Sequence, residues 1–147
     1  MRGIRHSRRG MAFVAVCAAL ALLIAFAGLG IDLGRMLVEH RALRTQAKAA
    51  ALRAAWALDG TSQGLAAARK QAETGAGGRF EKIEFAAEAK GEWSAEPADP
   101  GQAKLARVTL RQSVELTLVR AVVPETAKWV RAAAVARLTA AGVELAR

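Results

Sequence analysis

An uncharged run of 21 residues near the N-terminus, from Met11 to Ile31, constrains this chain more than any other feature. As an α-helix it rises roughly 31 Å, about the thickness of the hydrocarbon core of a bilayer. Asp32 ends the run, and four arginines precede it: Arg2, Arg5, Arg8 and Arg9. Because basic residues stay on the cytoplasmic side of a span, the sequence predicts a cytoplasmic leader (residues 1–10), a membrane span (11–31) and export of the remaining chain from Asp32 onward.

The same segment also fits a cleaved secretory signal. Basic residues, an apolar stretch and the small-residue motif Ala25-Phe26-Ala27 occur in the order that such a signal requires. However, the stretch is longer than a usual signal core of about 7–15 residues. Helix-forming sequence also continues past the cleavage point, so cleavage would remove the first half of a longer helix. We therefore favour the uncleaved span and keep the signal peptide as the alternative.

The periodicity after Asp32 predicts that the helix continues to Leu58 as a membrane-exit amphipathic helix (residues 32–58). A single helix from Met11 to Leu58 would be roughly 72 Å long. A domain of the remaining 90 or so residues is too small to cover it, so its first half needs lipid or other helices around it. The positions that recur at three- and four-residue steps are Leu33, Met36, Leu37, His40, Leu43, Ala47, Ala50, Ala54 and Leu58.

Small and charged residues cluster where the helix leaves the membrane, and we expect them to serve helix packing and assembly. They are Gly28, Gly30, Asp32, Gly34 and Arg35. Glycines let helices approach closely in membranes, and they also permit a local bend. Asp32 either marks the end of the span, where a carboxylate keeps most of its hydration, or pairs with a basic group of another subunit, such as a neighbouring copy's Arg35.

Residues 59–147 predict an exported α+β domain, with a short helix followed by a small antiparallel sheet. Asp59-Gly60 ends the long helix, and Thr61 or Ser62 caps a second helix that runs to about Glu73. The glycine-rich residues 75–78 then break it.

Alternating residues from Arg79 onward predict three or four strands. Ile83 and Phe85 mark the apolar face of the first strand. A short strand over 92–95 places Trp93 either in the core or at an exposed edge. Residues 97–101 form a turn, 105–123 a long strand that bends or breaks near Gln112, and Pro124-Glu125 another turn. Residues 128–139 read as the last strand, although the alanines at 132–136 also suit a helix.

The sequence contains no recognisable catalytic or metal-binding motif. Cys17 is the only cysteine, and the two histidines, His6 and His40, stand alone. The formal net charge is +9, but no DNA-binding motif accompanies it. We therefore expect no enzyme activity, no cofactor, no metal and no nucleic-acid partner.

Two stretches together resemble one known family. Gly28-Leu29-Gly30-Ile31-Asp32-Leu33-Gly34-Arg35 lies between an apolar helix and the alanine-rich block Ala49-Ala50-Ala51-Leu52. Later, VTLRQSVELTLVRAV precedes AAAVARLTA. Over residues 9–58, and more loosely beyond, the chain resembles the TadG-like pilus-assembly proteins of the Tad (Flp) system, which share an Ala-Gly-Leu-x-x-Asp-x-Gly-Arg context.

The chain also departs from that family. Arg44 and Lys48 stand where the family has a Leu-Gln pair and then an aspartate, which changes the polar face of the helix. Gly10-Met11 is a candidate processing site, but Ala15 replaces the glutamate that prepilin peptidase substrates carry five residues after the cleaved glycine. The long extracellular extension of many members is missing.

The resemblance implies a pilin-like component of a Tad-type pilus or related secretion system in the bacterial inner membrane. As a minor pilin, a pseudopilin or an anchored assembly factor, it would associate through its helix with other pilin-like subunits or with the assembly platform. That implies a hetero-oligomer surrounded by membrane lipid, with a periplasmic domain that can enter a cell-surface pilus. The alternative is an exported binding domain, signal-bearing or membrane-anchored, unrelated to pili; a third is a membrane-tethered accessory protein of an enzyme.

Overall fold

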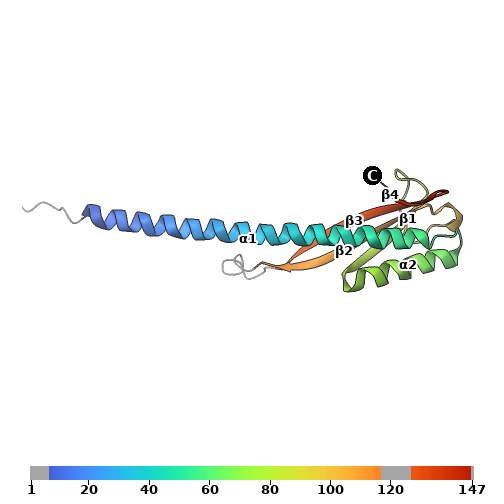
Figure 1. Ribbon diagram of the computed structural model, residues 1–147, viewed down its shortest axis with the longest axis horizontal. Coiled ribbons are helices and arrows are strands. Elements are labelled where there is room, and N and C mark those ends of the chain that lie inside the picture. The colour runs from blue at the N-terminus through green and yellow to red at the C-terminus, as the bar shows by residue number, and fades with distance from the viewer. Residues whose placement is uncertain (1–6, 117–126, 147) are drawn as a thin grey trace, which may run out of the picture.

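The computed structural model describes residues 7–116 and 127–146 and has the predicted α+β, pilin-like arrangement (Figure 1). A long N-terminal helix carries a second helix and a four-stranded antiparallel sheet on its C-terminal half. The predicted turn at Pro124-Glu125 lies outside the described residues. The elements are α1 (Ser7–Trp56), α2 (Ser62–Ala76), η1 (Gly77–Arg79), β1 (Phe80–Ala86), η2 (Pro100–Gln102), β2 (Leu105–Glu115), β3 (Ala127–Thr139) and β4 (Gly142–Leu145).

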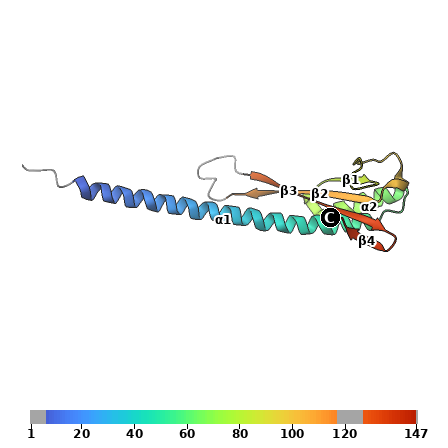
Figure 2. The same ribbon diagram turned by 90° about the horizontal axis from the view of Figure 1, so that it is seen from above.

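Helix α1 has two halves with opposite surroundings. Its N-terminal half projects from the folded domain in both views (Figures 1 and 2), and its apolar side chains are exposed: Met11 by 68%, Leu20 by 58% and Ile31 by 57%. Its C-terminal half lies against α2 and the sheet, with Leu43 only 1% exposed. The helix passes through the exit glycines without interruption.

The packed face of α1 differs from the predicted one at its start. Leu33 and Leu37 are 57% and 53% exposed, whereas Asp32 is 1% exposed. A face that includes Leu43 continues backward in steps of three or four residues through Met36 to Asp32. Leu33 and Leu37 lie to one side of that line, so they remain outside the core.

Alanines let α1 and α2 approach closely. Five alanines of α1 are fully buried, and α2 presents a small residue at every fourth position. A Cβ placed on Gly75 of α2 would lie 3.8 Å from the Cα of Ala50, at ordinary van der Waals distance, so α2 lies close to α1 at this glycine. The alanine-rich block of α1 therefore packs against other elements of the same chain. The buried small residues are Ala47, Ala50, Ala51, Ala54 and Ala55 on α1, and Gly64, Ala68, Ala72 and Ala76 on α2.

Helix α2 begins as predicted. The Gly64 N–H donates to Thr61 Oγ1 at 3.0 Å, and the Thr61 hydroxyl and N–H donate to Asp59 Oδ1 at 2.7 and 2.9 Å. The bond from the Thr61 hydroxyl, followed by that from its N–H, lowers the pKa of Asp59 below its usual value. The helix ends at Ala76 rather than near Glu73, because Gly75 packs against α1 instead of breaking the helix.

The sheet has the order β1-β2-β3-β4, with every neighbouring pair antiparallel. Val108 and Leu110 of β2 are fully buried, as their alternation predicts. The alanine run at 132–136 forms part of β3 and not a helix, since Ala132 pairs with Leu110 and Ala136 with Ala106.

Two details of the predicted sheet are wrong. Residues 92–95 contribute only a single bridge, from Ser94 to Phe85, and not a strand. The fourth strand is instead β4, which returns along β3 after a turn at Gly142 (φ +132°). Four residues are too few to show an alternating pattern, so β4 has no clear sequence signal.

Candidate functional site

The candidate site is the part of α1 where its exposed apolar half ends and its packed half begins. In the described ranges 7–116 and 127–146, no three histidine, cysteine, aspartate or glutamate side chains lie close enough to hold a metal ion. The site must therefore be judged as a surface, by its shape, exposure and charge.

The five exit residues divide between two faces of α1. Gly28 and Asp32, one turn apart, are buried on the face that leads into the core. Gly30 and Gly34, also one turn apart, are exposed, and a Cβ on either would have no atom within 4 Å. The sequence predicts one cluster, but the structure divides it: Gly28 and Asp32 are covered, whereas Gly30 and Gly34 are exposed.

The carboxylate of Asp32 is buried in the folded chain and is therefore not hydrated by bulk water. It is 1% exposed, so the expectation that this carboxylate stays hydrated is wrong for the folded protein. A buried carboxylate needs a compensating partner, and Asp32 does take part in an interaction, as does Arg35. Contact between Asp32 and another subunit would require this face of α1 to open, whereas the Arg35 side chain is accessible.

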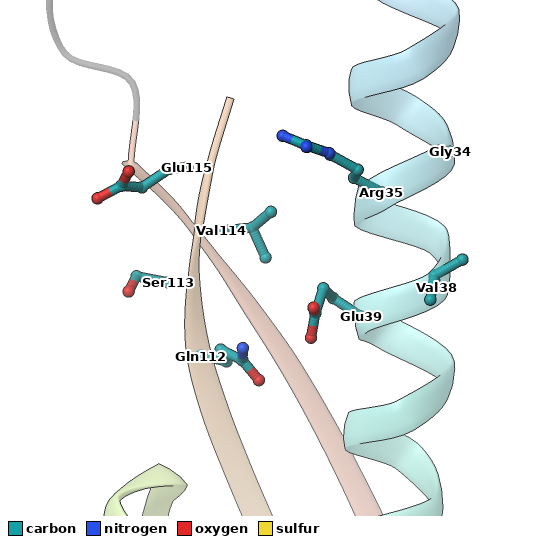
Figure 3. A pocket seen from close by; sticks show the side chains of 8 residues that line it. All are labelled: Gly34, Arg35, Val38, Glu39, Gln112, Ser113, Val114 and Glu115. Atoms are coloured by element: carbon teal, nitrogen blue, oxygen red, sulfur yellow. The ribbon is translucent and has the colours of Figure 1, made fainter. Parts of the chain in front are cut away.

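A cavity of about 600 Å³ separates α1 from the end of β2 at this level (Figure 3). The side chains of Arg35 and Glu39 extend from α1 toward β2, where Val114 and Gln112 face them. The buried Oε1 of Gln112 has no hydrogen-bond partner among the described residues. The cavity is lined by Gly34, Arg35, Val38, Glu39, Gln112, Ser113, Val114 and Glu115.

The sheet face that points away from α1 carries arginine–tryptophan pairs that the sequence does not predict. The Arg107 guanidinium lies 3.7 Å from the ring centroid of Trp93, and that of Arg111 lies 5.0 Å from Trp129. Trp93 is half-buried, and therefore neither a core anchor nor a bare edge aromatic, whereas Trp129 is 60% exposed. The alternation along β2 does place Arg107 and Arg111 on this face, but it cannot reveal their aromatic partners.

The apolar half of α1 is long and hydrophobic enough to cross a bilayer. The helix from Gly10 to Trp56 contains a window of mean hydropathy 2.7, of which 6% is buried, and an N-terminal signal sequence meets the same criterion. Gly10 and Met11, the candidate processing site, lie near the start of α1 and are exposed.

Comparison with known proteins adds no assignment. No protein family, no curated protein and no solved structure matches the chain. The TadG-like resemblance therefore stays a prediction, and functional inference rests on the fold and on the surface described above.

Proposed function

We propose that this chain is a single-pass membrane component of a Tad-type pilus or related secretion system, acting as a minor pilin or as an anchored assembly factor. In this role the N-terminus is cytoplasmic, the span is residues 11–31, and the α+β domain faces the periplasm. The protein works by helix–helix association with other pilin-like subunits or with the assembly platform.

The observation that carries the proposal is the division of α1. Its C-terminal half is consumed by packing inside the domain, while its N-terminal half presents exposed apolar side chains over the whole length of the predicted span. Such a surface is stable only in a hydrophobic environment. Lipid supplies that environment before assembly, and the helices of neighbouring subunits supply it afterwards.

The exposed glycines favour association over simple anchoring. Gly30 and Gly34 form an exposed Gly-x-x-x-Gly pair on α1, and Gly34 also borders the cavity toward β2. Small residues at this spacing let two helices approach closely in a membrane. An anchor that only holds a domain to the bilayer has no need of such a face.

The alternative, an exported binding domain unrelated to pili, is favoured by one structural fact. Cleavage after Ala27 would remove only the exposed part of α1, because the packed face begins at Gly28 and Asp32. The domain would therefore keep its core without the span, contrary to the argument that cleavage damages the helix.

The intact mass of the protein isolated from its native membrane separates these functions. Full-length mass supports the permanent anchor, and loss of residues 1–10 supports processing at Gly10-Met11 and entry into a filament. Loss of residues 1–27 would refute the membrane-bound role and leave the secreted domain.

Association is tested by crosslinking the intact protein in its native membranes. Gly30→Leu should reduce crosslinks to identified pilus subunits, because leucine blocks close approach of a second helix. Ala25→Leu is the matched control: it makes a comparable change in the same span, seven residues before Asp32 and so on the Asp32 side of the helix. Equal crosslinking of both variants and the wild type would contradict the mechanism.

A further inference from the structure

The length of the apolar run fixes where the domain sits relative to the bilayer. Residues 11–31 rise roughly 31 Å and so fill the hydrocarbon core, which places its edge near Asp32. The headgroup layer extends roughly 5–8 Å further on each side. This position of the bilayer edge rests on the membrane-anchored role proposed above.

The end of the β2–β3 pair lies at the same level. Residues 34–39 of α1 line one cavity with residues 112–115 of β2, and they lie roughly 5–12 Å beyond Ile31 along the helix. Glu115 ends β2 and Ala127 begins β3, and these strand ends point back toward the N-terminal half of α1 (Figures 1 and 2). The near part of this range overlaps the headgroup layer, so the sheet reaches that layer at its strand ends.

The side chains at this end suit a lipid surface. Trp129 lies opposite Ser113 on the face away from α1, since its neighbour Val130 is buried toward the core, and 60% of Trp129 is exposed. The Arg111 guanidinium lies over the Trp129 ring. Lys128 pairs with Val114 and is therefore exposed on the opposite face, at the same end of the sheet. Tryptophan is enriched at membrane interfaces, and basic side chains are attracted to anionic headgroups.

We propose that this end of the sheet is a second membrane contact, docked on the anionic phospholipid headgroups of the leaflet on the exported side. Trp129 inserts at the interface, and Arg111 and Lys128 contact lipid phosphates. Together with the span, this contact prevents rotation of the domain about the axis of α1. The Gly30–Gly34 face is thereby presented in one orientation to an incoming helix.

Trp56 provides an internal control. It is 68% exposed, comparable with Trp129, but it lies at the other end of α1, roughly 37 Å beyond Ile31 along the helix. Docking therefore brings lipid to Trp129 and leaves Trp56 in water.

The test uses the full-length protein in vesicles of phosphatidylglycerol and phosphatidylcholine with a headgroup nitroxide quencher. The double variant W56F/W93F leaves Trp129 as the only tryptophan, and W93F/W129F leaves Trp56. We expect Trp129 to lose most of its fluorescence, more so with phosphatidylglycerol, and Trp56 to keep its own. Equal quenching of the two would overturn the inference.

A charge variant tests the headgroup contact separately. In the W56F/W93F background, R111Q/K128Q should remove the effect of phosphatidylglycerol on quenching, while near-ultraviolet circular dichroism confirms an intact fold. An unchanged effect would contradict the role of these two cations. Carbonate extraction keeps the two proposals distinguishable: loss of the protein from the vesicles refutes the anchor, whereas an unquenched Trp129 in retained protein refutes only the docking.

Discussion

The contact between α1 and α2 leads to the sharpest prediction, the effect of Ala50→Leu. Ala50 is fully buried, and a Cβ added to Gly75 of α2 would lie 3.8 Å from the Ala50 Cα. Leucine extends two bonds beyond the Cβ of alanine, and the close-packed surroundings of a fully buried residue must move to admit those atoms. The two helices must therefore separate, or the leucine must adopt a strained rotamer.

The expected cost of Ala50→Leu is about 3 kcal/mol, the upper part of the usual range for overpacking, because Ala50 is fully buried between elements that pack on both sides of α1. For a domain of this size, each kcal/mol lowers the melting temperature by roughly 4–8 °C. The full-length variant in detergent should therefore melt roughly 12–24 °C below the wild type.

Ala49→Leu is the matched control, since Ala49 is the adjacent residue and is exposed. It should change the free energy of unfolding by no more than about 0.5 kcal/mol. Thermal unfolding followed by near-ultraviolet circular dichroism measures both variants, and amide hydrogen exchange over Ser62–Ala76 reports on the separation of α2. Equal melting temperatures for the two variants would refute the close approach of α1 and α2.

Three further predictions concern the domain. Gly64→Ala should lower the melting temperature although alanine favours helices, because its Cβ would overlap the Asp59 carboxylate; an unchanged or raised melting temperature would contradict this. Leu43→Ala should cost about 2–5 kcal/mol in chemical denaturation, whereas Leu37→Ala, at a position 53% exposed, should cost far less; similar values would argue against the packed face of α1. The lowered pKa of Asp59 stabilises the fold above the ordinary carboxyl pKa, and this stabilisation should disappear as pH falls through the lowered value; Asp59→Asn should reduce that part of the pH dependence, and an identical acid titration of the variant would rule it out.

The sequence predicts those features that depend on local repetition. The uncharged run ending at Asp32 predicts the apolar half of α1, and the period-two pattern predicts the buried positions Val108 and Leu110. The Thr61 cap is equally local, because its hydrogen bonds involve only residues 59–64. In each case the sequence pattern and the structure that it predicts belong to one continuous segment of the chain.

The candidate site is only partly visible in the sequence. Gly28 and Gly30 look equivalent there, yet the fold buries one and exposes the other. The pairing of Arg111 with Trp129 joins two strands whose register depends on the whole sheet. No local sequence pattern predicts the different exposure of the two glycines or the contact between Arg111 and Trp129.

The sequence by itself determined the long apolar helix, the α+β order of elements and the alternating faces of the long strands, since side-chain periodicity follows directly from backbone geometry. Only the tertiary structure decided that Leu37 is exposed although it lies on the predicted face, that the Asp32 carboxylate is buried, and that Gly75 continues a helix instead of ending it. Those outcomes depend on which surfaces meet, and close packing brings together residues far apart in the chain.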